Sequence, residues 1–262
     1  MSFAILGVNI AVISIVFFLL WLASLWLEDS SIVDIFWGLG FVVIAWTTCL
    51  LTESNPRGLL VAILATVWGI RLGGYLAWRN IGKGEDYRYK EMRDYHGDRF
   101  PLVSLYLVFG LQGLIMLVVS LPLQIAQTSS SPLNFVDYIA GGLWLTGFLF
   151  ESIGDLQLAR FKSDSENRGK VMDRGLWRFT RHPNYFGDFL VWWAFFCFAA
   201  ATGAFWAVIS PLIMSYFLIR VSGVALLEQS LTKKRAGYGS YIRRTSSLIP
   251  WPPKQEESSE TQ

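Results

Sequence analysis

Long apolar runs alternate with short polar segments along the whole chain. Seven runs are long enough to cross a bilayer as helices of about 20 residues, near residues 3–27, 32–51, 58–79, 101–126, 135–160, 184–203 and 205–227. In lipid a backbone must satisfy its own hydrogen bonds, as a helix does. The pattern therefore predicts an all-α fold: a polytopic membrane protein with about seven transmembrane helices, forming a single domain over residues 1–254.

Basic residues gather in alternate connections between these runs. Segments 79–99 and 160–181 and the tail are rich in Lys and Arg, whereas 127–134 and 200–205 have none. Cytoplasmic loops carry an excess of Lys and Arg. We therefore expect an outer amino terminus and a cytoplasmic carboxyl terminus. A bacterial inner membrane is a separate expectation, favoured over the endoplasmic reticulum. Arg57 is then the one basic residue on the outer side.

The composition narrows the class of protein further. Hydrophobic residues make up 53% of the chain and charged residues 16%, against about 25% charged in a soluble domain. The net charge of +2 argues against a nucleic-acid partner. Two cysteines, Cys49 and Cys197, and two histidines without ligand-like spacing argue against a metal site. Membrane lipid is the expected surrounding, and the polar residues 255–262 are expected to be disordered.

Ionisable residues inside the predicted spans point to function, because burying them in lipid is expensive. Asp34 begins the second run and Arg71 lies within the third. The others lie near the predicted cytoplasmic ends of later runs: Glu151, Asp155, Asp188 and Arg220. A polar cavity open to the cytoplasm would explain them. The structural alternatives are a salt-bridge network and, for Asp34, a helix cap.

The segment from Gly175 to Asp188 (GLWRFTRHPNYFGD) is the most specific feature of the chain. Arg178 and Arg181 offer planar forks for phosphate. Pro183 suits the first position of a helix, whose N-terminus attracts anions. A second loop, 79–89, interleaves charged and aromatic residues. Together they suit a phosphorylated, ring-bearing nucleotide, and the pattern leaves open a nicotinamide dinucleotide or S-adenosylmethionine.

Five motifs carry a resemblance to a known family. They are Ser31–Trp37 (SIVDIFW), Trp68–Arg71 (WGIR), Glu85–Tyr89 (EDYRY), Arg181–Asp188 (RHPNYFGD) and Tyr238–Pro250 (YGSYIRRTSSLIP). Over about residues 25–253 the chain resembles the steroid 5-alpha-reductase superfamily, in its bacterial-type branch of unknown function. The resemblance implies seven helices that bind NADPH at the cytoplasmic face and pass hydride to the β-carbon of an enone in a lipophilic substrate.

The resemblance also implies roles for individual residues. An acidic residue and a tyrosine polarise the carbonyl in such reductases. Asp34 matches the acid, Trp68 stands where the tyrosine is expected, and Tyr75 or Tyr87 could substitute. Asp34, Trp68 and Arg71 are therefore the candidate catalytic residues.

The candidate cofactor contacts come from both basic loops, the fifth run and the tail. They are Glu85, Asp86, Arg88, Tyr89, Glu151, Asp155, Arg160, Lys162, Trp177, Arg178, Arg181, His182, Asn184, Tyr185, Asp188, Arg220 and Tyr241. His182 could instead cap or orient its neighbours.

Two other classes of protein remain open. The Arg-His-Pro-x-Tyr run, Glu228, the segment 237–241 and Pro250 also resemble isoprenylcysteine-methyltransferase-like enzymes, which would imply S-adenosylmethionine in place of NADPH. A non-catalytic lipid-binding membrane protein could keep the same helices without the chemistry. The sequence favours the reductase.

Overall fold

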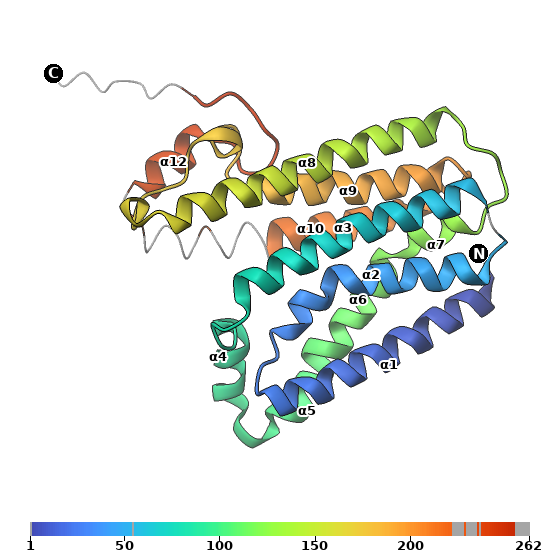
Figure 1. Ribbon diagram of the computed structural model, residues 1–262, viewed down its shortest axis with the longest axis horizontal. Coiled ribbons are helices and arrows are strands. Elements are labelled where there is room, and N and C mark those ends of the chain that lie inside the picture. The colour runs from blue at the N-terminus through green and yellow to red at the C-terminus, as the bar shows by residue number, and fades with distance from the viewer. Residues whose placement is uncertain (1, 54, 222–227, 229–234, 236, 255–262) are drawn as a thin grey trace. The chain divides into compact units, whose positions relative to one another are not determined.

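The computed structural model describes residues 2–53, 55–221, 228, 235 and 237–254, and their regular secondary structure is helical apart from one isolated bridge between Thr180 and Ser246 (Figure 1). Within these residues, four helical stretches are long and apolar enough to cross a membrane: Phe3–Leu27, Ile32–Leu51, Pro56–Asn80 and Tyr87–Val119. The expectation of an all-α chain with membrane-spanning helices is confirmed to that extent. A total of seven spans stays a prediction.

The chain divides into two compact units. Unit 1 comprises residues 1–137 and 198–210, and unit 2 comprises residues 138–197 and 211–262. The single membrane domain expected over 1–254 stays a prediction, and residues 255–262, expected to be disordered, lie outside the described residues.

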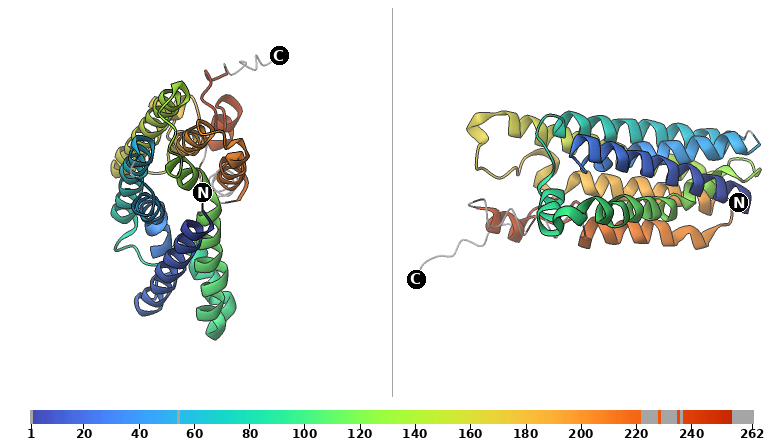
Figure 2. Two further views of the ribbon diagram at one scale, coloured as in Figure 1. Left: turned by 90° about the vertical axis from the view of Figure 1, so that its right-hand side faces the viewer. Right: turned by 90° about the horizontal axis from the view of Figure 1, so that it is seen from below.

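Three long helices of unit 1 begin and end close to the first three apolar runs. They are α1 (Phe3–Leu27), α2 (Ile32–Leu51) and α3 (Pro56–Asn80). Asn55 caps α3, since its Oδ1 accepts from Gly58 N at 2.6 Å and Pro56 occupies the first turn. α2 and α3 run side by side (Figures 1 and 2), and a Cβ on Gly38 would lie 2.7 Å from the Gly69 carbonyl oxygen. Small residues thus permit their close approach.

The fourth apolar run is not one regular helix. After α4 (Tyr87–His96) come the 3-10 turn Gly97–Arg99, α5 (Phe100–Ser104), the π-helix Leu105–Gly110 and α6 (Leu111–Val119). α7 (Leu121–Gln127) then starts after Ser120. Pro122 explains this break, because a proline has no N–H to continue the preceding helix and is favoured in a first turn.

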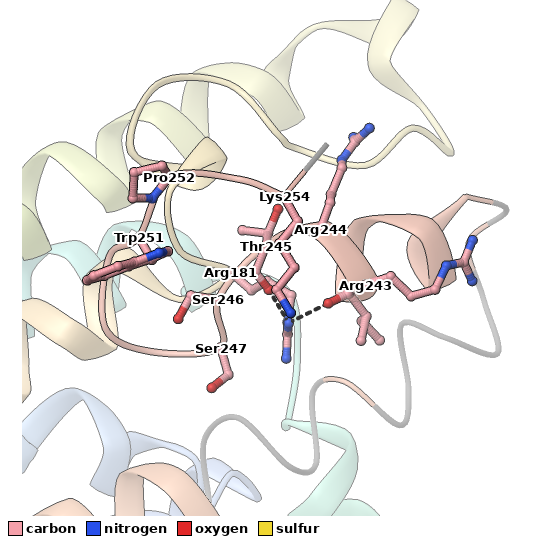
Figure 3. A pocket seen from close by; sticks show the side chains of 10 residues that line it. Arg181, Arg243, Arg244, Thr245, Ser246, Ser247, Trp251, Pro252 and Lys254 are labelled. Carbon is pink, nitrogen blue, oxygen red and sulfur yellow. Dashed lines mark hydrogen bonds between the residues drawn. The ribbon is translucent and has the colours of Figure 1, made fainter. Parts of the chain in front are cut away.

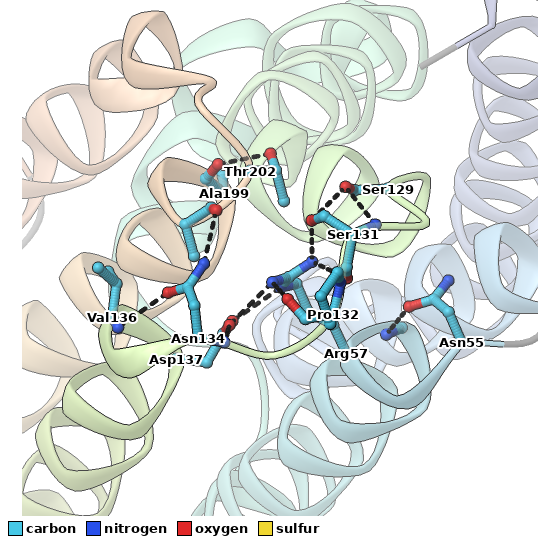
Figure 4. A network of polar contacts seen from close by, with 12 residues as sticks. Asn55, Arg57, Ser129, Ser131, Pro132, Asn134, Val136, Asp137, Ala199 and Thr202 are labelled. Atoms are coloured by element: carbon cyan, nitrogen blue, oxygen red, sulfur yellow. Dashed lines mark hydrogen bonds and ion pairs between the residues drawn. The ribbon is translucent and has the colours of Figure 1, made fainter.

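Arg57, expected on the outer side, is one of the most buried side chains, at 1% exposure. Its Nε and one terminal nitrogen donate to the two oxygens of Asp137 at 2.7 and 2.8 Å. The rest of the guanidinium donates to the carbonyl oxygens of Ser131 and Pro132 and to the Ser131 hydroxyl (Figure 4). Arg57 therefore joins the start of α3 to the segment before the next long helix, within unit 1.

Unit 2 is built on most of α8 (Phe135–Ser163) and of α9 (Pro183–Ala200), of which residues 135–137 and 198–200 belong to unit 1. They coincide with the fifth and sixth apolar runs. The seventh run starts in unit 1 with the 3-10 turn Phe205–Val208. It continues with α10 (Ile209–Tyr216), which enters unit 2 at residue 211, and the π-helix Phe217–Val221. Its predicted end, residues 222–227, lies outside the described residues. α12 (Tyr238–Arg244) follows.

α8 and α9 approach each other through a pair of glycines. A Cβ added to Gly187 would lie 2.4 Å from the Glu151 amide nitrogen and 2.5 Å from the Gly147 carbonyl oxygen. Both atoms belong to the backbone of α8, so neither can turn aside. The glycines therefore set the spacing of the two helices that carry Glu151, Asp155, Asn184 and Asp188.

Gly187→Ala is expected to lower the free energy of unfolding by about 1–3 kcal/mol, because overpacking forces the two backbones apart. Thermal unfolding in detergent would measure the loss. Gly142→Ala is the matched control on α8, since nothing lies within 4 Å of the added Cβ. Equal melting temperatures for the two variants would contradict the close packing.

Candidate functional site

A hydrogen-bonded network in unit 1 centres on Asp34, in the first turn of α2. The Tyr89 hydroxyl donates to Asp34 Oδ1 at 2.8 Å, and an Arg88 terminal nitrogen donates to Oδ2 at 2.7 Å. Gln112 Nε2 in turn donates to the Tyr89 oxygen at 3.2 Å. Tyr89 is 6% exposed. The structure therefore gives Asp34 a phenol and a cation as partners, beyond the role of a helix cap.

The two acids before α4 hold the local backbone. Asp86 caps α4, and its Oδ1 accepts from the Arg88 amide at 3.1 Å and from Arg88 Nε at 2.9 Å. Glu85 accepts two bonds from Arg93 and one from the Ser30 amide. Burial raises the pKa of Glu85, but the bonds from Arg93 and Ser30 outweigh it and leave the pKa below its ordinary value. Glu85 thus connects α4 to the segment before α2, and Asp86 fixes the start of α4. The role of both acids as cofactor contacts stays a prediction.

Trp68 and Arg71 occupy different surroundings on α3. Trp68 is fully buried, with its ring centroid 5.9 Å from that of Phe41. The Arg71 guanidinium lies 5.6 Å from the ring centroid of Tyr75. Tyr87, the other tyrosine considered as a substitute, is 59% exposed. The tyrosine that bonds to Asp34 is Tyr89, which was expected from the sequence to be among the cofactor contacts.

In unit 2, Arg181 is a buried guanidinium with partners from distant parts of the chain. Its Nε donates to Glu228 Oε1 at 2.7 Å, and one terminal nitrogen donates to the carbonyl oxygens of Ile242, at 3.0 Å, and Thr245. The side chain expected to bind phosphate thus bonds to the polypeptide itself. Arg181 positions the segment that follows α12.

His182 and Glu228 complete this cluster. His182 Nε2 lies 3.2 Å from Glu228 Oε1, and its ring stacks on Tyr185 with centroids 5.5 Å apart. Burial raises the pKa of Glu228, but the bonds from His182 and Arg181 prevail and hold it below its ordinary value. Burial and the nearby Glu228 raise the pKa of Tyr238 to about 12, so its phenol keeps its proton at neutral pH.

A pH dependence follows from the lowered pKa of Glu228. An unperturbed Glu has a pKa of about 4.3, so the stabilisation from Glu228 is complete above that pH and is lost as pH falls through the lower folded value. Glu228→Gln should cost about 2 kcal/mol near pH 7, the order of one hydrogen bond to a charged group. The difference between variant and parent should shrink toward pH 3. Denaturant unfolding across this range would measure it, and a pH-independent difference would contradict the assignment.

Polar side chains of α8 and α9 form a second group in unit 2. Glu151, Asp155 and Asp188 are buried, and Asn184 Nδ2 donates to Asp155 Oδ1 at 3.1 Å. Within the described structure, the Asn184 Oδ1 atom is buried and accepts no hydrogen bond. The group thus offers carboxylates and one open amide oxygen, which suit the hydroxyl and amide donors of a ligand.

The remaining predicted contacts are either exposed or part of the packing. Arg160, Lys162, Arg178 and Arg220 are exposed. Trp177 is buried and donates through Nε1 to the Gly154 carbonyl oxygen at 3.0 Å, and the Tyr241 hydroxyl donates to the Trp177 carbonyl oxygen. Trp177 and Tyr241 therefore hold unit 2 together.

The C-terminal arm, residues 238–254, lies on the loop before α9. Thr180 bridges to Ser246, and the Thr180 hydroxyl donates to the Leu248 carbonyl oxygen at 2.8 Å. The Trp251 amide donates to the Phe179 carbonyl oxygen at 2.9 Å. A basic hollow of about 360 Å³ opens between arm and loop (Figure 3), lined by Arg181, Ile242, Arg243, Arg244, Thr245, Ser246, Ser247, Trp251, Pro252 and Lys254.

Sequence reasoning missed several polar residues that the structure places in contact. In unit 1, Asn9 of α1 is fully buried, and its Nδ2 donates to Thr48 Oγ1 at 2.9 Å and Gln124 Oε1 at 3.0 Å. An amide in the middle of an apolar run was the available signal.

Among the described residues, no group of three or more His, Cys, Asp or Glu side chains is arranged to hold a metal ion.

Comparisons with known proteins give a family but no activity. A family model described as a protein of unknown function, DUF1295, matches residues 20–245. The uncharacterized protein C594.04c of Schizosaccharomyces pombe is 27% identical over 223 residues, which cover 69% of this chain. The match covers 60% of the yeast protein, so the chain spans about three fifths of that relative's length. No solved structure matches.

Proposed function

The chain belongs to the DUF1295 family of proteins of unknown function, and on that premise we propose that it is a membrane reductase. It uses NADPH to reduce a C=C bond conjugated to a carbonyl group in a lipophilic substrate, of steroid, isoprenoid or similar lipid type. The resemblance of its motifs to the steroid 5-alpha-reductase superfamily supports this class of reaction.

The contact between Tyr89 and Asp34 carries the proposal. Hydride addition to the β-carbon of an enone places negative charge on the carbonyl oxygen, which a positioned donor stabilises. A buried phenol held by a carboxylate is such a donor, and Gln112 fixes it from the other side at 3.2 Å. Methyl transfer from S-adenosylmethionine develops no charge on a carbonyl oxygen, so this network favours the reductase.

The phenol has a single proton to offer. In the described arrangement Tyr89 donates it to Asp34 Oδ1. A substrate carbonyl must therefore replace Asp34 as the acceptor, or Asp34 must itself carry a proton and donate to Tyr89. In the first case Arg88, 2.7 Å from Asp34 Oδ2, balances the charge of the carboxylate.

The polar group of α8 and α9 fits parts of the proposed cofactor. The open Asn184 oxygen can accept an N–H of a carboxamide, and Asp155 and Glu151 can accept ribose hydroxyls. The exposed cations Arg178 and Arg160 can approach phosphates. NADPH, when bound, supplies the hydride.

Ligand titration tests the proposal. The protein purified in detergent would be titrated with NADPH, NADH and S-adenosylmethionine, and quenching of its tryptophan fluorescence recorded. NADPH should bind, and Asn184→Leu should weaken it about tenfold, the effect of one lost hydrogen bond. The control Asn167→Ala alters the loop after α8. Absence of NADPH binding to the folded parent protein would refute the proposed function.

A methyltransferase is the second candidate, and one observation favours it. Glu228 bonds to both Arg181 and His182, so the structure joins the Arg-His-Pro-x-Tyr run to the later glutamate that the chain shares with isoprenylcysteine-methyltransferase-like enzymes. Selective binding of S-adenosylmethionine in the same titration would establish this class. If no nucleotide binds, a non-catalytic lipid-binding role becomes the better account.

The orientation and substrate route belong to the same proposal. We place the amino terminus outside and the basic loops in the cytoplasm of a bacterial inner membrane, where NADPH is available, and let the apolar substrate enter from the bilayer. A cysteine at Gly82, in the loop after α3, should then react with impermeant thiol reagents only after the membrane is opened. Labelling of this cysteine in intact cells would show that the orientation is the opposite one.

A further inference from the structure

The C-terminal arm exposes large apolar side chains in an ordered segment. Ile249 is 62% exposed and Trp251 is 69% exposed, whereas the preceding residue, Leu248, is buried. Pro250, between the two exposed side chains, is only partly exposed, so Ile249 and Trp251 lie on the outer side of the arm. Phe179, whose carbonyl oxygen accepts from the Trp251 amide, is 42% exposed. Together these three form an outward apolar surface held by backbone bonds.

Trp251 of this surface also lines the basic hollow, together with four cations. Of the four that line the basic hollow, Arg181 is paired with Glu228 and Arg244 with Asp173. Arg243 and Lys254 are exposed, and the described part of the chain offers neither an ion-pair partner. Figure 3 shows the Arg243 side chain extending outward from α12. Counting the residues that the structure describes, the hollow therefore has more cations than carboxylates, beside aromatic and aliphatic side chains.

The position of the arm along α9 indicates a depth. Phe179 lies four residues before Pro183, where α9 begins. If α9 crosses the bilayer as its apolar sequence predicts, Phe179 and Trp251 lie near the headgroup level, where Trp and basic residues are enriched. A soluble nucleotide would gain little from covering Ile249 and Phe179, whereas the headgroup region covers them as well as the charges.

We propose that the C-terminal arm is a docking surface for anionic phospholipid: Phe179, Ile249 and Trp251 enter the headgroup region, and the basic hollow receives a lipid phosphate near Arg243 and Lys254. The ligand is an anionic glycerophospholipid of the surrounding leaflet. Each basic residue near such a surface strengthens binding about fivefold. The proposal is independent of any catalytic activity.

An environment-sensitive fluorophore on a cysteine at Ser247, in the full chain with Cys49 and Cys197 replaced by alanine, would report docking. Ser247 is exposed, and replacing it leaves the three apolar side chains unchanged. In nanodiscs of phosphatidylglycerol its emission should move to the blue and be quenched by lipid-borne spin labels. In phosphatidylcholine, or at about 1 M salt where the screening length is about 3 Å, both effects should weaken. A fluorophore at the exposed Ser165 is the control and should not respond.

Variants separate the electrostatic contribution to lipid docking from the apolar contribution. Arg243→Gln and Lys254→Gln should each weaken docking to phosphatidylglycerol about fivefold, and Trp251→Ser should abolish the spin-label quenching. Equal emission in the two lipids, or no quenching in either, would overturn the proposal. Displacement of the signal by 2′,5′-adenosine diphosphate would also overturn it, because the hollow would then bind a nucleotide phosphate. Thermal unfolding of each variant checks that it is folded.

Discussion

Arg57→Ala is expected to lower the free energy of unfolding by about 3–5 kcal/mol. The substitution leaves the carboxylate of Asp137, 3% exposed, without its cation, and an uncompensated buried charge costs this much. It also removes donors from the Ser131 and Pro132 carbonyl oxygens. Denaturant unfolding in detergent would measure the change.

The double variant Arg57→Ala/Asp137→Ala isolates the pair. Removing both charges should cost less than the sum of the two single substitutions, because neither charge is then left alone. Arg79→Ala is the matched control, since Arg79 is an exposed arginine at the other end of α3 and should change stability by about 0.5 kcal/mol or less. A single-variant loss no greater than the control's would contradict the burial of Arg57.

Tyr89→Phe is expected to reduce the rate of enone reduction by about 10²–10⁴-fold while NADPH binding is unchanged. The substitution removes only the hydroxyl that Asp34 and Gln112 hold, and proton donors of this kind contribute that factor. Oxidation of NADPH in the presence of a panel of lipophilic enones would measure the rate, and fluorescence titration the affinity.

Tyr87→Phe provides the matched control two residues away. Tyr87 is 59% exposed, and residues two apart on a helix face different ways, so its hydroxyl should not matter. Asp34→Asn keeps the shape of the carboxylate and should lower the rate as well. Full activity of Tyr89→Phe with an enone would refute the role of this phenol and leave the cofactor assignment to be judged separately.

The helices could be predicted closely because hydropathy is local information. The runs near 3–27, 32–51 and 58–79 match α1, α2 and α3 within two residues at each end. The run near 101–126 was predicted as one span, because an apolar window does not register the backbone N–H that Pro122 lacks.

The partners of charged side chains could not be predicted in the same way. Arg57 and Asp137 are 80 residues apart, and Asp34 and Tyr89 are 55 apart. Periodicity indicates which residues share a helix face but not which helices meet. The resemblance implied an acid and a tyrosine for the carbonyl, and Trp68 stands where that tyrosine was expected. The structure shows that a tyrosine from a later helix bonds to the acid.

The bonds of Arg181 determine when unit 2 can finish folding during synthesis of the protein. Its guanidinium precedes α9, yet two of its acceptors are the carbonyl oxygens of Ile242 and Thr245, more than 60 residues later. Until the ribosome has released that stretch, Arg181 must remain hydrated or be held by the insertion machinery. Unit 2 can therefore reach its final packing only after residues 242–245 have been synthesised, and a premature stop codon after α9 would leave the Arg181 guanidinium without these acceptors.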